Sequence, residues 1–377
     1  MLAQNNINCV TMSEKETKST GFLGGGTRSS NLELFRIITM LVIIAHHYVV
    51  NSGLTSIICD SSSLSAIDYF LLIFGWGGKT GINCFVLITG YFMCTSKITA
   101  LKYGKLVGTL YFYKILFFLI FWLSGYSTFS AKAFLKMMFP FFTVRDNFTA
   151  CFLLFYLFIP FINKLLHALT EKEHLILMAL CLFIYTILPS FTKANVGYNY
   201  VTWFIVLYII ASYIRLYPKQ IFEGTGKWGL LTAGAVASSW MSVITLAWIG
   251  NRFGKTQIAY FFVSDSNKIL AVITALCAFL FFKNLKIRQS RFINTLAASA
   301  FGVLLIHANS DTMRQWLWRD VLKNVEWYHT PWIYLHTIGS VLGVYIVCTV
   351  IDMVRRYLLE KPFLEWLNKK LSMKCLH

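Results

Sequence analysis

Asn31-Leu-Glu-Leu-Phe-Arg36-Ile-Ile-Thr-Met-Leu-Val-Ile-Ile-Ala-His46-His47-Tyr48 decides the fold class, because this stretch is apolar enough to enter a bilayer as a helix. Between Arg36 and His46 only Thr39 is polar. Ionisable groups inside a bilayer are costly, and their default interpretation is functional. Arg36 and His47 lie eleven residues apart, which is about three turns and about 16 Å along the axis, so both lie on one face.

Helical phase separates the two neighbouring histidines. His46 points about 80° away from the line that joins Arg36 and His47, so His47 is the better partner for the arginine. Glu33 precedes Arg36 by three residues and can form an ion pair with it on the helix surface. The alternative role for Arg36 is therefore a charged anchor at the end of the span.

The composition is that of an integral membrane protein. Apolar residues make up 57% of the chain and charged residues 13%, against about 25% charged residues in soluble domains. The net charge of +18 could indicate nucleic-acid binding, but the Lys and Arg residues fall mainly between the hydrophobic runs. Such a distribution is typical of the positive-inside rule, so we expect no nucleic-acid partner.

About 20 apolar residues cross a bilayer as a helix. On this measure we expect an all-α polytopic membrane protein with about ten spans. They lie near residues 34–52, 67–94, 106–124, 148–166, 174–190, 200–217, 229–249, 260–282, 295–309 and 331–352. The second span is long and broken by glycines, and the ninth is short.

Charge then orients the spans. Alternate connections are rich in basic residues, and we place these on the cytoplasmic side: Lys97, Lys102 and Lys105; Lys164 and Lys172; Arg215, Lys219 and Lys227; Lys283, Lys286, Arg288 and Arg291; Arg355, Arg356, Lys361, Lys369, Lys370 and Lys374. The other connections carry fewer: Lys132, Lys136 and Arg145, or Lys193 alone. Both termini and Arg36 are then cytoplasmic, and His47 lies toward the outer mouth of its span.

The ends of the chain are predicted to be tails around one transmembrane domain at 31–356. Residues 1–30 are polar, contain Gly24-Gly25-Gly26 without the Lys-Ser/Thr of a phosphate loop, and lack a secretory-signal pattern. We expect a flexible cytoplasmic tail there, a retained first span, and a basic cytoplasmic tail at 357–377. The nine cysteines form no Cys-x-x-Cys pair; we interpret them as small buried hydrophobes and expect no metal.

The last outer connection, residues 310–330, contains Trp316, Trp318 and Trp327 among basic residues. This pattern predicts an amphipathic helix on the outer interface, with its tryptophans at headgroup level.

A lysine lies among glycines in the second span, in Phe74-Gly-Trp-Gly-Gly-Lys79-Thr-Gly-Ile-Asn83. For the glycines we favour close helix packing. Lys79 either reaches the depth of His47 as a site residue or snorkels outward. Near the start of the eighth span Asp265 and Lys268 can pair with each other.

His307 lies at the outer end of the ninth span, as His47 does in the first. Two histidines at one depth can share a cavity, although an interfacial histidine in contact with headgroups is the alternative for His307. A histidine is suited to act as general base toward a hydroxyl, because its pKa of about 6.5 lies near the operating pH. Acyl transfer needs such a base together with donors for the developing oxyanion. A cationic cytoplasmic mouth suits a phosphate-bearing donor, but a proton-coupled transporter could use the same groups.

Three motifs in this order resemble those of the acyltransferase-3 family of integral membrane acyltransferases. They are Asn-Leu-Glu-Leu-Phe-Arg36 followed by His47, then Gly77-Gly-Lys-Thr-Gly-Ile-Asn-Cys-Phe-Val-Leu-Ile-Thr-Gly-Tyr-Phe92, and Phe301-Gly-Val-Leu-Leu-Ile-His307. The likeness runs from about residue 30 to residue 360. It is nearest to the polysaccharide O-acetyltransferases of bacteria.

The resemblance implies transfer of an acetyl or short acyl group from acyl-CoA, as co-substrate, to a hydroxyl of a cell-envelope glycan or lipid-linked sugar, in a multi-pass protein of the bacterial cytoplasmic membrane. It implies His47 as the catalytic histidine and Arg36 as its partner. Lys79, Asn83 and His307 are the substrate-binding candidates. Some members carry Arg-x-x-Arg before the third span. This chain has Lys102-Tyr-Gly-Lys105 there, which keeps the positive charges but lacks the guanidinium groups that bind a phosphate through two parallel hydrogen bonds. Lys102 and Lys105 are the candidates for binding the donor.

Two other functions stay open. One is a transporter or flippase for a lipid-linked saccharide, with Lys79 and the histidines along its path. The other is a non-catalytic assembly subunit, which would tolerate loss of His47. Because the sequence ends after the tenth predicted span, we expect all chemistry within the membrane unit or with a partner.

Overall fold

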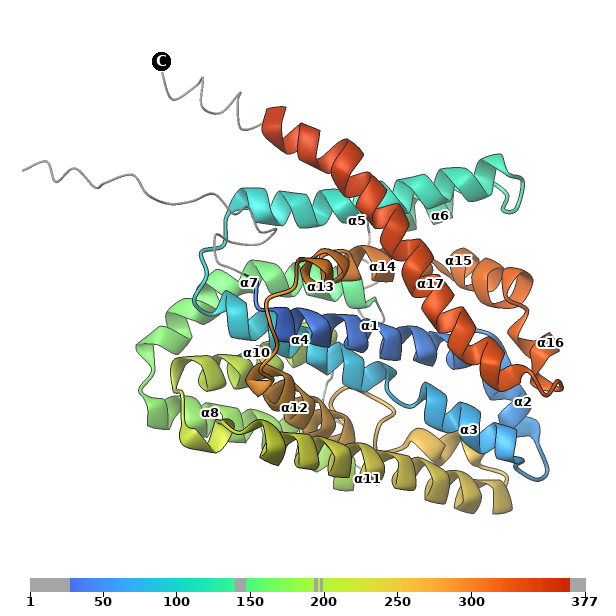
Figure 1. Ribbon diagram of the computed structural model, residues 1–377, viewed down its shortest axis with the longest axis horizontal. Helices are drawn as coiled ribbons and strands as arrows, with labels where there is room; N and C mark the ends of the chain where they lie inside the picture. The colour runs from blue at the N-terminus through green and yellow to red at the C-terminus, as the bar shows by residue number, and fades with distance from the viewer. Residues whose placement is uncertain (1–27, 140–146, 193–195, 197–198, 367–377) are drawn as a thin grey trace, which may run out of the picture.

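The computed structural model describes residues 28–139, 147–192, 196 and 199–366, and these residues form helices and connections without any strand (Figure 1). Most of the predicted tail at 1–30, half of the tail at 357–377, and the predicted outer-side residues Arg145 and Lys193 lie outside the described residues.

Among these described residues, seven helical segments are long and apolar enough to cross a membrane, or up to eight if a bent pair is counted as one span. They are α1 (Ser30–Val50), α3 with α4 (Ala66–Gly75 and Gly78–Met93), α5 (Ala100–Leu123), α7 (Phe148–Ala168), α8 to α9 (Glu171–Leu182 and Leu188–Phe191), α11 (Thr225–Arg252) and α17 (Ile333–Arg355) with its continuation to Trp366. The remaining helices are α2 (Leu54–Asp60), α6 (Ala131–Met138), α10 (Tyr200–Leu216), α12 (Ile269–Asn284), α13 (Arg291–Ala297), α14 (Ala300–His307), α15 (Asp311–Gln315) and α16 (Asn324–Tyr328).

The prediction of ten spans is not confirmed. Helices α10 and α12 occupy two of the predicted spans but have 17 and 16 residues, which is about 25 Å of helix against a hydrocarbon core of about 30 Å. The predicted ninth span is divided between α13 and α14, and the chain then turns by 94° into α15 and the residues up to Val321. The sequence marks the end of the apolar run, because Asp311, Arg314, Arg319 and Asp320 follow it, but it does not give the angle of the bend.

Helix α10 occupies the interior of the helical bundle. All residues from Val206 to Ile214 are buried, and α10 packs against α4 and α7. A helix that is apolar on every side buries every side. This core positions α4, and through α4 it positions α1.

Helices α1 and α4 cross at the glycines of the second motif. A Cβ atom added at Gly78 would lie 2.2 Å from Cγ of His46, and one at Gly77 would lie 2.3 Å from Val42. At Gly81 the distance to Ile43 would be 2.7 Å. The predicted close packing at the glycines is therefore confirmed, and α3 and α4 are separated at Trp76 and Gly77.

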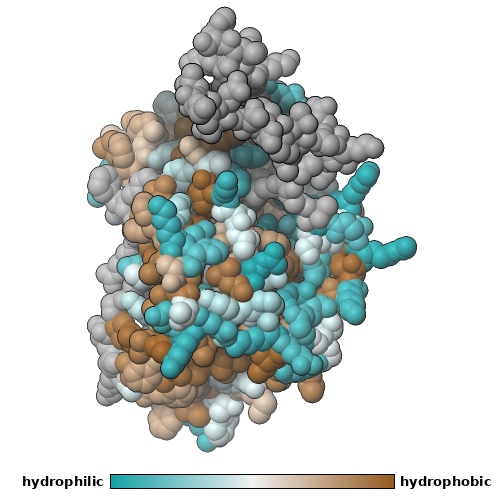
Figure 2. Space-filling view, turned by 90° about the vertical axis from the view of Figure 1, so that its left-hand side faces the viewer, coloured by the Kyte–Doolittle hydropathy of each residue, from teal (hydrophilic) through white to brown (hydrophobic). Residues whose placement is uncertain are grey.

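One end of the molecule carries most of the exposed basic residues, and we call it the basic end. Helices α1, α5 and α11 begin there, on the left in Figure 1. Viewed directly, this end shows hydrophilic side chains gathered across its face (Figure 2). The exposed basic residues in the connections between helices at this end include Lys97, Lys172, Lys219, Lys227 and Arg288. The assignment of the basic end to the cytoplasm stays a prediction from the positive-inside rule.

The tryptophan-rich connection differs from the expected interfacial helix. It consists of the short helices α15 and α16 with a π-helical turn between them. Trp318 is fully buried and packs edge-on against Tyr48, whereas Trp316 and Trp327 are partly exposed. Trp318 therefore packs inside the protein and is not available to anchor the chain among headgroups. Five of the cysteines are buried, as expected of small hydrophobes: Cys84, Cys94, Cys151, Cys277 and Cys348.

Candidate active site

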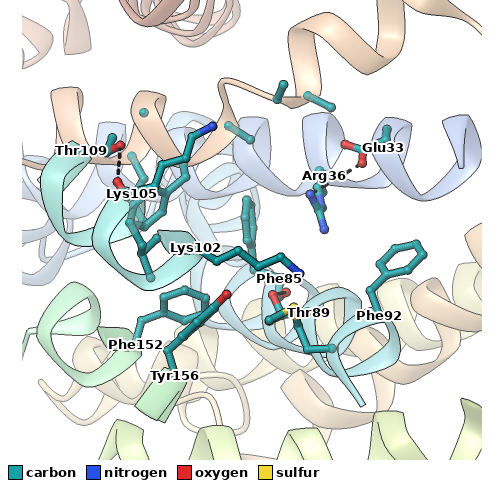
Figure 3. A pocket seen from close by; sticks show the side chains of 18 of the residues that line it. Glu33, Arg36, Phe85, Thr89, Phe92, Lys102, Lys105, Thr109, Phe152 and Tyr156 are labelled. Carbon is teal, nitrogen blue, oxygen red and sulfur yellow. Dashed lines mark hydrogen bonds and ion pairs between the residues drawn. The ribbon is translucent and has the colours of Figure 1, made fainter. Parts of the chain in front are cut away.

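A cavity of about 590 Å³ opens toward the basic end, between α1, α4, α5, α7, α14 and α17 (Figure 3). Seven basic side chains line it, together with only two carboxylates, those of Glu33 and Asp352. The basic residues are Arg28, Arg36, Lys97, Lys102, Lys105, Arg215 and Arg355. Such an excess of positive charge in a concave site concentrates anions.

Arg36 is the cation that α1 contributes to the cavity, and its guanidinium points into the space (Figure 3). It forms the predicted ion pair with Glu33, with 3.6 Å between Nη1 and Oε1. The same carboxylate lies 3.6 Å from Arg28. One carboxylate shared between two guanidinium groups leaves a net positive charge for a ligand.

Lys102 and Lys105 lie on the first two turns of α5 and both line the cavity. In Figure 3 the Lys102 side chain extends across the cavity, and its Nζ donates to the carbonyl of Lys97 at 2.8 Å. Lys105 forms an ion pair with Glu360 at 2.6 Å. The structure thus brings both predicted donor-binding lysines together with Arg36.

The inner part of the cavity is apolar and aromatic. Its walls include Phe85, Phe152, Phe301 and Leu304. Leu304 precedes His307 by three residues on α14, which is about 4.5 Å along the helix. The cavity therefore ends about one helical turn from His307.

His47 and His307 form a hydrogen-bonded pair at this inner end. Nδ1 of His47 lies 3.0 Å from Nε2 of His307, and Nδ1 of His307 lies 2.6 Å from the carbonyl oxygen of Val303. A carbonyl only accepts, so a neutral His307 carries its proton on Nδ1 and accepts at Nε2. The proton between the rings then belongs to Nδ1 of His47, which leaves Nε2 of His47 as a free base. These proton positions are assigned from the hydrogen bonds.

His46 has a different environment, as helical phase predicted. Its Nδ1 lies 2.6 Å from the carbonyl oxygen of Gly75, and its ring packs on Gly78. These contacts give His46 a structural position in the α1–α4 crossing.

Lys79 neither reaches the histidine pair nor snorkels freely. Its Nζ donates to the hydroxyl of Tyr200 at 2.6 Å and lies 3.5 Å from Oδ1 of Asp265. The carboxylate of Asp265 therefore forms an ion pair with Lys79 and not with Lys268, as the sequence suggested. Lys268 instead donates to the carbonyl of Pro189 at 2.6 Å.

Asn83 is fully buried and holds three elements together. Its Nδ2 donates to the carbonyl of Ser266 at 2.7 Å, and its Oδ1 accepts from Nε1 of Trp203 at 2.8 Å. With both ends of the amide engaged, the geometry gives Asn83 a structural role, and its predicted role in substrate binding has no support here.

Comparison with known families decides the class of the protein. A family model described as an acyltransferase domain, acyltransferase-3, matches residues 29–352. The chain belongs to the acyltransferase-3 family. The comparisons with curated proteins and with solved structures gave no match. The matched residues include the cavity walls from α1 to α14 and both paired histidines, so this is a membrane acyltransferase whose helices surround a cationic cavity.

Four basic residues of this acyltransferase-3 cavity were not singled out as site residues from the sequence: Arg28, Lys97, Arg215 and Arg355. Arg215 donates to the hydroxyl of Tyr91 at 3.1 Å. Arg355 is buried, with 3.0 Å between its Nη2 and Oδ1 of Asp352, and Tyr113 donates to the same carboxylate at 2.9 Å. In the sequence both arginines fit the positive-inside rule, and no local pattern distinguishes a cavity wall from a loop.

Proposed function

We propose that this acyltransferase transfers an acetyl or other short acyl group from acyl-CoA to a hydroxyl of a cell-envelope glycan or lipid-linked sugar, in the bacterial cytoplasmic membrane. One observation carries the proposal: a cation-lined cavity ends about one turn from a histidine pair that has a free basic nitrogen.

The charge and the volume of the cavity support this donor. Phosphate groups of coenzyme A would bind near Arg36 and Lys102 at the basic end, because cations on a concave surface recognise phosphate. A volume of about 590 Å³ lies within the range of about 300–1,000 Å³ of ligand pockets. The aromatic inner walls would surround the pantetheine arm and direct the thioester toward His47.

The reaction follows from the assigned proton positions. Nε2 of His47 takes the proton of the acceptor hydroxyl while the acceptor oxygen forms a bond to the thioester carbonyl carbon. The tetrahedral intermediate then expels the thiolate as the carbon–sulfur bond breaks, and the His47 imidazolium returns the proton to the sulfur. The products are an ester and free coenzyme A. His307 holds the His47 ring by accepting from its Nδ1, and thereby stabilises the imidazolium.

Removing the charge of Lys102 tests where the donor binds. We expect Lys102→Gln to raise KM for acetyl-CoA by about tenfold, because a hydrogen bond to a charged group contributes about 1.5–3 kcal/mol. The change in kcat should be smaller, since Lys102 is on the first turn of α5 at the basic end, whereas His47 is on the last turn of α1. Initial rates of transfer from radiolabelled acetyl-CoA to envelope glycan, measured in isolated membranes, give both constants.

Lys172 provides the matched control, because it is exposed at the basic end but does not line the cavity. Lys172→Gln should leave KM unchanged. Equal KM values for the Lys102 variant, the Lys172 variant and the unmodified protein would rule out this donor site.

A further inference from the structure

Tyr156 presents an unpartnered hydroxyl group to the cavity at the basic end. The residue lies on α7, lines the cavity and is only 4% exposed. Among the residues that the structure describes, its hydroxyl oxygen is buried and no hydrogen-bond partner is found for it. In Figure 3 the Tyr156 ring lies beside Phe152, and its hydroxyl points toward the side chain of Lys102. A buried hydroxyl without a partner destabilises the fold, so a ligand that completes its hydrogen bonds would explain it.

The direction of α7 places Tyr156 on the cavity wall near the cations. Helix α7 ends at the basic end, where Nε2 of His167 on its last turn lies 3.0 Å from the carbonyl oxygen of Cys94, the C-cap of α4. The Tyr156 ring centroid lies 6.0 Å from that of Tyr103, which follows Lys102 on α5. The hydroxyl is therefore close to the level at which the donor phosphates would bind.

The distance from Tyr156 to the histidine pair excludes a contact with the reacting carbonyl. The ring of Phe152 lies 6.1 Å from the ring of Phe301, measured between centroids. Phe301 precedes His307 by six residues, about 9 Å of helix, and Tyr156 follows Phe152 by four residues, about 6 Å in the direction of the basic end. Along the helix axes Tyr156 thus lies about 15 Å from the level of His307. Its hydroxyl faces the part of a donor that joins the phosphates to the thioester.

Thr89 supplies a complementary group on the same cavity. It lies on α4, and its Oγ1 donates to the carbonyl of Phe85 at 2.9 Å. Because the hydroxyl proton is used, the Thr89 oxygen can only accept from a ligand, whereas the Tyr156 hydroxyl can donate. In Figure 3 both side chains face the space that Lys102 crosses. A secondary amide has one acceptor and one donor and matches this pair, while a phosphate only accepts.

We propose that Tyr156 and Thr89 form an amide-binding subsite for the arm of the donor, in which Tyr156 donates to an amide carbonyl and Thr89 accepts from an amide N–H. The inference rests on the proposed function and deepens it, because the pantetheine arm of coenzyme A contains secondary amides between its phosphates and its thiol. The subsite selects pantetheine thioesters over thioesters of simple thiols. By holding the arm, it also fixes how far the thioester extends toward His47.

Two donors that differ only in the amide N–H groups test the subsite. Isolated membranes receive S-acetyl-pantetheine or its analogue with an ester oxygen in place of each amide N–H, both radiolabelled in the acetyl group, and the label in envelope glycan is counted. Neither donor carries a phosphate, so the cations of the cavity do not distinguish them. We expect kcat/KM to be about fivefold or more higher for the amide donor, the gain from a neutral hydrogen bond to Thr89.

The two variants should act on different parts of the amide. Thr89→Val should abolish the preference for the amide donor, because valine cannot accept from the N–H. Tyr156→Phe should lower kcat/KM for both donors by about two- to tenfold and keep the preference, because both retain the carbonyl. Its melting temperature should not fall, since the hydroxyl bonds to no other described residue. Tyr345→Phe is the matched control: Tyr345 is also a buried tyrosine with an unpartnered hydroxyl, but it lies on α17 and does not line the cavity.

Tyr345→Phe should leave kcat/KM unchanged for both donors. Equal use of the two donors by the unmodified protein, a full preference in Thr89→Val, or unchanged rates in Tyr156→Phe would overturn the subsite alone. A lower melting temperature for Tyr156→Phe than for Tyr345→Phe would assign the hydroxyl to the fold and overturn it as well. Absence of transfer from both donors and from acetyl-CoA in membranes that contain the unmodified protein would contradict the proposed function itself.

Discussion

His47→Ala should lower the rate of acyl transfer by about 10²–10⁴-fold, the contribution usual for a general base, while the protein still inserts and folds. The expectation follows from the free Nε2 that the hydrogen bonds through His307 and Val303 leave on His47. Transfer of radiolabelled acetyl groups to envelope glycan in isolated membranes measures the loss. The amount of folded protein is determined in parallel by size-exclusion chromatography in detergent.

Variants of other histidines separate catalysis from packing. His307→Phe should also lower kcat strongly, because His47 loses its acceptor, whereas His307→Gln can still accept through its amide oxygen and should restore part of the rate. His329 is exposed in the connection at 310–330, so His329→Ala should transfer at the normal rate. A folded His47→Ala variant with normal kcat would refute the role of His47 as base.

Gly78→Ala should abolish most of the folded protein. The added Cβ would lie 2.2 Å from the His46 ring, so α1 and α4 would have to separate at the crossing that positions His47. Overpacking of a core costs about 1–3 kcal/mol or more, and a collision with a ring fixed by its own hydrogen bond to Gly75 has little room to relax. The melting temperature and the yield of monodisperse protein in detergent measure the effect.

Gly234→Ala makes the same chemical change where nothing lies within 4 Å of the new methyl group. Gly234 lies in the interior of α11, where alanine favours a helix over glycine, whereas Gly78 is the first residue of α4. The control should fold normally. If both variants showed the same melting temperature as the unmodified protein, close packing at Gly78 would not be needed.

Several features of the site follow from the sequence because they depend on local geometry. The spacing of Arg36 and His47 along one helix gives their separation without any tertiary information. The glycines around Lys79 predicted a close crossing, because only glycine lets two backbones approach so closely. Charge asymmetry placed Lys102 and Lys105 at the same end as Arg36. The side of the membrane that this end faces and the chemical roles of these residues stay predictions.

Other features arise only from tertiary contacts. The 94° bend after His307 depends on packing of α15 against the bundle, and the ion pair of Lys79 with Asp265 joins residues 186 positions apart. By hydropathy α10 and α12 resemble the long spans, but in the structure both are shorter helices.

The central claim is that the protein esterifies a cell-envelope glycan. The most direct test is mass spectrometry of the envelope glycan from a deletion strain, before and after mild alkali, against the same strain complemented with the unmodified gene. We predict an alkali-labile acyl group on the glycan, which for acetyl adds about 42 mass units when it replaces a hydroxyl hydrogen. This group should be lost on deletion and restored by complementation. Identical ester content in the two strains would contradict it.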